Sequence, residues 1–128
     1  MTMPAGKYWI GDLCYVLEDE WDEACDLMFS NRDGNGGEGE FTMKDGRKFA
    51  VFSTKWGDGC YLDQEGRQYG VDAGSIGCIL AKDLTYPGSV PEGPSSGGNI
   101  VDIPEDFEPK GSRKDGIIQF GPVIIETA

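Results

Sequence analysis

The hydrophobic and polar positions of this chain repeat over two segments that lie 20 residues apart, 44–51 (KDGRKFAV) and 64–71 (QEGRQYGV). In each segment an acid and a glycine stand between two runs that alternate apolar and polar residues, a pattern typical of a β-hairpin. Phe41 and Tyr61 extend the match upstream. A repeat this short does not suit a solenoid unit, so the sequence predicts two successive hairpins of like geometry.

The length of the hairpin loop decides which side chains face each other. A three-residue loop sets Phe41 opposite Phe49, whereas a two-residue turn on Asp45 and Gly46 would set Phe41 opposite Ala50. A slip of one residue turns every side chain to the other face of the sheet. The aromatic match therefore favours the three-residue loop, closed by a left-handed glycine and a bulge.

The second hairpin, in the same register, sets Tyr61 opposite Tyr69 and Asp63 opposite Arg67. Arg47 and Arg67 are then interpreted as cross-strand charge partners beside a turn rather than as ligand-binding residues. The repeat predicts a scaffold and says little about chemistry.

Residues 18–29 (EDEWDEACDLMF) are the one segment with a helical pattern. Its apolar side chains recur at helical spacing, which predicts one amphipathic helix near the N-terminus, packed on the sheet. This apolar stripe consists of Leu17, Trp21, Ala24, Cys25 and Met28. Acids fill the other face. Such a run is usually a solvated helix surface, and mimicry of nucleic acid by spaced carboxylates is the alternative.

Further apolar segments predict strands at residues 8–17, 77–82 and 99–103 and again over residues 115–128. Residues 86–98 are rich in Pro, Gly and Ser and predict an irregular loop. The expected fold class is therefore α+β, a mostly antiparallel β meander of about 6–8 strands with one packed helix. The length predicts a single domain over residues 1–128.

The charge of the chain is strongly negative and uneven. The 128 residues include 23 acids and 11 bases, a net charge of −12, and residues 1–40 alone carry ten acids and two bases. Such a field repels phosphate, so we expect neither direct nucleic-acid binding nor membrane binding. Neither a signal-peptide pattern nor a membrane-length apolar run is present, which predicts a cytoplasmic protein. Its four cysteines form no C-x-x-C pair and are expected to be free thiols.

The chain contains no histidine, which excludes Ser-His-Asp and Cys-His catalysis and histidine-ligated metals. Segment 73–77 (AGSIG) has the loose form of a nucleophile elbow around Ser75, but an elbow needs a base and a strand–turn–helix context. Segment 71–75 (VDAGS) resembles the catalytic loop of aspartic proteases. Ala73 stands where that family carries a hydroxyl, so a turn in which Asp72 accepts backbone hydrogen bonds is the preferred interpretation.

The short loops between strands are where a site is expected, because functional residues collect on loops held by a rigid scaffold. The candidate ligand-binding residues are Asp58, Asp63, Asp72 and Ser75. Convergence of the three aspartates in a concave pocket, with raised pKa values, would indicate a carboxylate-dependent hydrolase. Scattered, exposed aspartates would favour a binding module.

Segment 31–42 (NRDGNGGEGEFT) partly matches an EF-hand calcium loop. The candidate ligands are Asn31, Asp33, Asn35, Glu38 and Glu40. Thr42 stands where the bidentate glutamate should be, and a strand rather than a helix is expected to follow. A polar connector between elements is the preferred interpretation and a calcium-binding module the alternative. No other cofactor is expected.

Segments 8–17 (YWIGDLCYVL) with Trp21, 56–63 (WGDGCYLD) and 69–80 (YGVDAGSIGCIL) resemble a group of small uncharacterised proteins from phage and bacterial genomes. That group has no assigned activity, so the resemblance implies a phage or prokaryotic accessory protein and carries over no catalytic residue. Together with the missing catalytic residues, it predicts a non-enzymatic binding or accessory protein; the sequence allows for a protein partner but does not identify the ligand. The sequence does not define the oligomeric state.

Overall fold

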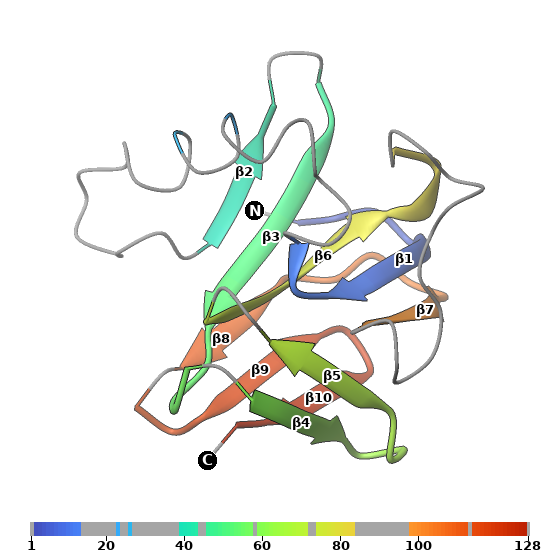
Figure 1. Ribbon diagram of the computed structural model, residues 1–128. Helices are drawn as coiled ribbons and strands as arrows, with labels where there is room; N and C mark the ends of the chain where they lie inside the picture. The colour runs from blue at the N-terminus through green and yellow to red at the C-terminus, as the bar shows by residue number, and fades with distance from the viewer. Residues whose placement is uncertain are drawn as a thin grey trace.

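Two antiparallel sheets of five strands each make up the fold (Figure 1). The computed structural model describes residues 2–13, 23, 26, 39–43, 46–57, 59–71, 74–83, 98–112 and 114–127. The upper sheet in Figure 1 runs in the order β2 (Gly39–Thr42), β3 (Lys48–Ser53), β6 (Ser75–Leu80), β1 (Gly6–Gly11) and β7 (Gly98–Ile103). The lower sheet runs in the order β5 (Gln68–Val71), β4 (Gly59–Asp63), β10 (Val123–Glu126), β9 (Ile117–Phe120) and β8 (Lys110–Ser112).

The upper sheet is buried on both faces along its central strands. Ile10 and Cys78 are cross-strand neighbours that belong to the core between the sheets. Trp9, Phe49 and Ile79 lie side by side on the opposite face, and their exposed fraction is also 0%. A sheet buried on both faces needs almost unbroken apolar strands. This requirement explains the continuous hydrophobic runs of β1, β3 and β6.

The lower sheet is buried on one face only, and its strands alternate accordingly. In β10, Val123 and Ile125 are buried in the core, whereas Ile124 and Glu126 are exposed. We call the set of outward-pointing strand residues the outer face of the lower sheet. It consists of Cys60, Leu62, Gln68, Lys110, Ser112, Ile117, Gln119, Ile124 and Glu126.

The two sheets meet along their edges as well as through the core. The Asn99 side chain in β7 donates to the Gln68 carbonyl of β5 at 2.8 Å. On the other side, Gly111 of β8 lies so close to Phe52 of β3 that a Cβ there would stand 2.3 Å from the ring. Phe52 in turn packs against Phe120 with ring centroids 6.1 Å apart.

The prediction of an α+β fold is wrong. The described residues form ten strands, and no described helix reaches seven residues, since η2 (Ala81–Asp83) is a single 3₁₀ turn. The predicted amphipathic helix, residues 18–29, lies outside the described residues except for Glu23 and Asp26. The strand count was too low partly because β8, with the sequence KGS, has no hydrophobic alternation that would reveal it.

The predicted meander is also wrong, although both hairpins form. Strand β3 pairs with β6 rather than with β4, so the first hairpin belongs to the upper sheet and the second to the lower. The chain crosses between the sheets at residues 54–57, where the Thr54 hydroxyl donates to the Gly57 carbonyl at 2.6 Å. Residues 56–59 (WGDG) of this connection have the Gly and Asp composition of a hairpin turn, so the sequence pattern does not separate the two.

The predicted hairpin register is confirmed in both copies. Phe41 faces Phe49 with stacked rings 5.5 Å apart. Tyr61 faces Tyr69 across the second hairpin. Gly66 closes the second loop with a φ of +82°, in the left-handed region, and its amide donates to the Asp63 carbonyl at 3.0 Å. Both loops therefore have three residues, as the aromatic pairing required.

Replacing Gly66 by alanine should destabilise the fold by about 1–2 kcal/mol through backbone strain alone. A Cβ at this position would meet no heavy atom within 4 Å, so no steric clash contributes. Urea unfolding of Gly66→Ala measures the loss. The matched control is Glu65→Ala, an exposed neighbour in the same turn, with an expected change within about 0.5 kcal/mol. Equal stability of the two variants would contradict the left-handed loop.

Candidate functional site

Asp63, a predicted ligand-binding residue, is the centre of a buried hydrogen-bond network at the end of β4. Its side chain has an exposed fraction of 0%. Oδ1 accepts the backbone amides of Glu65 at 2.9 Å and Arg67 at 3.0 Å. Oδ2 accepts the guanidinium of Arg67 at 2.9 Å and the hydroxyl of Tyr69 at 2.7 Å. The predicted pairing of Asp63 with Arg67 is thus confirmed, and Tyr69 adds a donor that the sequence did not reveal.

The network keeps Asp63 ionised. Burial alone would raise the pKa of its carboxyl, but the hydrogen bonds from Arg67, Tyr69 and the two backbone amides outweigh burial and hold the pKa below its ordinary value. Burial raises the pKa of Tyr69, and the hydrogen bond to Asp63 raises it further. The hydrogen bond to Asp63 raises the pKa of Arg67. A carboxylate with a lowered pKa and four donors is suited to holding a turn together, not to exchanging protons.

Of the other predicted ligand-binding residues, the structure describes only Ser75. Asp58 and Asp72 lie outside the described residues. Ser75 is buried at the start of β6, opposite Ser53. Because Ser75 lies in a strand that continues to Leu80, it lacks the strand–turn–helix geometry of a nucleophile elbow.

Glu40, the one predicted calcium ligand that the structure describes, lies on edge strand β2 opposite Ala50. Ala50 belongs to the core between the sheets, so Glu40 is on the inward side of β2. Its Oε2 atom is buried and has no hydrogen-bond partner among the described residues, and burial raises its pKa. An inward charge of this kind discourages further strands from pairing with a sheet edge.

The remaining candidate calcium ligands, Asn31, Asp33, Asn35 and Glu38, lie outside the described residues. Among the residues that are described, no group of three or more acids or cysteines is close enough to hold a metal ion. Calcium binding therefore stays a prediction of the sequence.

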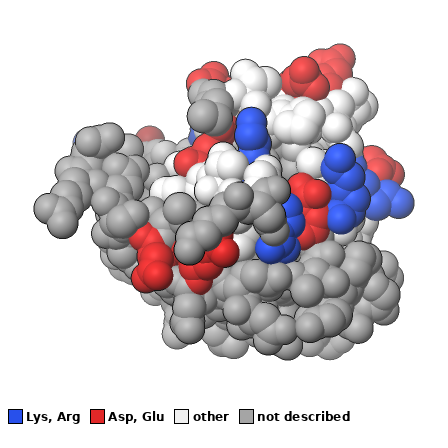
Figure 2. Space-filling model, turned by 90° about the horizontal axis from the view of Figure 1, so that it is seen from above, with Lys and Arg blue, Asp and Glu red and all other residues white. Residues whose placement is uncertain are grey.

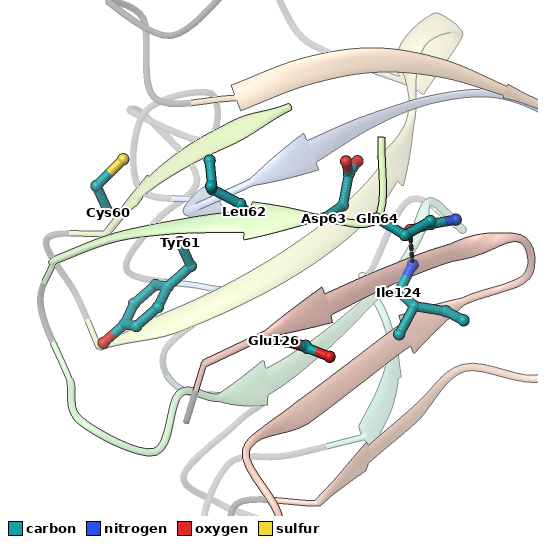
Figure 3. Close-up of a pocket in the computed structure, with 7 residues that line it drawn as sticks. All are labelled: Cys60, Tyr61, Leu62, Asp63, Gln64, Ile124 and Glu126. Carbon is teal, nitrogen blue, oxygen red and sulfur yellow. Dashed lines mark hydrogen bonds between the residues drawn. The ribbon is translucent and has the colours of Figure 1, made fainter. Parts of the chain in front are cut away.

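An open groove of about 700 Å³ runs along the outer face of the lower sheet (Figure 3). Seven residues line it, namely Cys60, Tyr61, Leu62, Asp63, Gln64, Ile124 and Glu126. Leu62 on β4 is 50% exposed and Ile124 on β10 is 37% exposed. Glu126 lies directly opposite Leu62 on one side and Ile117 on the other, so its carboxylate stands among aliphatic side chains.

Gln64 closes one end of the groove by tying β4 to β10. The side-chain oxygen of Gln64 accepts a hydrogen bond from the backbone N–H of Ile124 at 2.8 Å. The backbone N–H of Gln64 donates to the Ile124 carbonyl at 3.2 Å. The side-chain nitrogen donates to the Pro122 carbonyl. The backbone N–H and both side-chain polar atoms of Gln64 are therefore used in fixing the groove wall. The side chains of Leu62 and Ile124 remain exposed beside it.

Sequence reasoning missed this groove. The alternation of β10 (VIIE) indicates that Ile124 and Glu126 share a face, but nothing local indicates that β10 pairs with β4. Cys60, at the opposite end of the lining from Gln64, is exposed, whereas Cys78 is buried in the core and burial raises its pKa.

Comparison with known proteins does not supply a function. No family model matches the chain, and neither a curated protein nor a solved structure matches it. The site therefore has to be interpreted from its own geometry.

Replacing Asp63 by asparagine should cost about 2–3 kcal/mol of unfolding free energy, because hydrogen bonds to a charged group are lost and an amide faces two donors. Tyr69→Phe removes one of these bonds and should cost about 1–2 kcal/mol. Urea unfolding at neutral pH measures both. Glu65→Gln, an exposed acid in the same turn, is the matched control.

The acid dependence of stability provides the second readout on these variants. A carboxyl whose pKa is lower in the folded state stabilises the fold above its ordinary pKa of 3.8. That stabilisation is lost as the pH falls through the lower folded value. The difference in unfolding free energy between the native protein and Asp63→Asn should therefore become smaller as the pH falls below this ordinary pKa. A gap that stays constant in acid, or an Asp63→Asn cost no larger than that of Glu65→Gln, would contradict the network.

Proposed function

We propose that this protein acts by binding another protein through the outer face of its lower sheet, and that it has no catalytic role. The observation that carries this proposal is the exposed aliphatic surface of Leu62 and Ile124 beside an open groove. Exposed large apolar side chains that cluster within a polar surround are typical of protein interaction sites.

The chemistry of the two acids that line the groove, Asp63 and Glu126, supports binding rather than catalysis. A hydrolase that used carboxylates would need an acid free to exchange a proton with substrate. Asp63 is enclosed by four donors, and its pKa is lowered. Glu126, by contrast, borders the groove on an exposed strand end and is suited to pairing with a cationic group.

The setting of this function follows from the charge and from the sequence resemblance. Among the described residues, no helix is long and apolar enough to cross a membrane. A net charge of −12 disfavours anionic lipid and nucleic acid as partners. We place the protein in the cytoplasm as an accessory protein, phage-encoded or prokaryotic, that works by protein contacts.

Replacing Leu62 by glutamate should abolish capture of the partner without unfolding the protein. Leu62 points to solvent, so the variant places a charge on the contact surface and leaves the core intact. The native protein and Leu62→Glu are immobilised separately, exposed to lysate of the native host, and the retained proteins are compared by mass spectrometry.

The control for this capture is Asp102→Leu, which changes an exposed residue of the upper sheet. The proposal expects the same proteins on the native chain and on Asp102→Leu, and their loss on Leu62→Glu. If the native chain, Asp102→Leu and Leu62→Glu all retain the same proteins, a binding role for the outer face is contradicted.

A further inference from the structure

We propose that the partner at the outer face of the lower sheet is a second copy of this chain, joined through a two-fold contact in which Glu126 of each copy pairs with Lys110 of the other. The inference rests on the proposed function, that this face is a protein-binding surface, and adds the identity of the occupant.

The charge of the outer face sets it apart from the rest of the chain. Its nine outward-pointing residues include one acid, Glu126, and one base, Lys110, so the face has no net charge. The whole chain carries −12. Two copies repel each other least where the approaching surfaces are neutral. A cationic partner, in contrast, would be attracted to residues 1–40, where the net charge is −8.

Both charged residues of this face lack an ion-pair partner among the described residues. Glu126 is on β10 and Lys110 is on β8, with β9 between them and an offset of two residues along the strands. Standard sheet spacings place their Cα atoms about 12 Å apart, which puts an ion pair within one copy out of easy reach. The upper side of the molecule differs, because there acidic and basic side chains lie interspersed (Figure 2).

A symmetric contact satisfies both charges at once. Consider a two-fold axis that lies in the plane of the face and crosses the line from Glu126 to Lys110 at its midpoint, at a right angle. Rotation about this axis places Glu126 of one copy opposite Lys110 of the other, and Lys110 of the first opposite Glu126 of the second. On the spacing of an ideal sheet, Ile117 and Ile124 both lie beside this axis and would pack against their own counterparts. The two ion pairs would then flank a small centre formed by Ile117, Ile124 and the polar Gln119. A largely apolar centre with charges at its margin is the usual composition of a protein interface.

The size of the face predicts a weak dimer. Five strands span about 24 Å across the sheet, and four residues along a strand span about 14 Å, so the face measures roughly 340 Å². This is less than the roughly 800 Å² per partner of a standard stable interface. We therefore expect association that depends on protein concentration in the micromolar range.

Sedimentation velocity of the intact chain, from about 5 to about 500 μM, tests the proposal through a charge exchange. Glu126→Lys and Lys110→Glu should each weaken dimerisation about tenfold or more, because each places like charges opposite one another. The double variant Glu126→Lys/Lys110→Glu should restore the native affinity. The single variants change the net charge in opposite directions, so a general charge effect cannot weaken both.

Matched controls come from exposed turn residues off this face. Glu65→Lys and Lys114→Glu make the same changes in net charge and should leave the affinity within about threefold of native. Ile124→Asp should abolish the dimer, and circular dichroism verifies that each exposed-site variant stays folded.

The outcomes distinguish the inference from the function on which it rests. A monomer at every concentration, with lysate capture that still depends on Leu62, overturns the second copy and leaves the binding surface. A dimer insensitive to both charge reversals overturns the inferred contact. A monomer that also captures nothing through Leu62 overturns the inference and the proposed function together.

Discussion

The buried carboxylate of Asp63 is the interaction on which the lower sheet depends. Four donors from the following turn and strand surround it, so the β4–β5 hairpin can adopt only the register in which Asp63 faces the core. Because side chains alternate along a strand, Leu62 must then face outward. Gln64, the first residue of the turn after β4, lines the same groove. The same constraint therefore produces the apolar wall of the groove and the glutamine that joins β4 to β10.

The two sheets differ in how their faces are buried. The upper sheet has apolar side chains buried on both faces, with Trp9, Phe49 and Ile79 on one side and Ile10 and Cys78 on the other. The lower sheet buries one face and leaves the other to solvent, where Leu62 and Ile124 remain exposed. Large aliphatic side chains left outside a core, on a face without net charge, support the proposed contact with another protein.

Local patterns predicted local geometry well. The matched aromatics Phe41 and Phe49 gave the hairpin register, and the pairing of Asp63 with Arg67 followed from it. Sheet order depends on distant segments, and so β3 pairing with β6 could not be deduced from the composition of the turns. The groove has the same origin, because it joins β4 to β10, more than 50 residues apart in the chain. The α+β assignment gave a helical pattern in one segment too much weight against many short strands.

The contact through the outer face can be mapped directly by amide chemical shifts recorded over a series of protein concentrations. We predict that concentration-dependent shifts gather on Lys110, Ile117, Gln119, Ile124 and Glu126, and that the central strands β1, β3 and β6 of the upper sheet stay unchanged. Shifts that gather on the upper sheet, or spectra that do not change with concentration, would contradict association through this face.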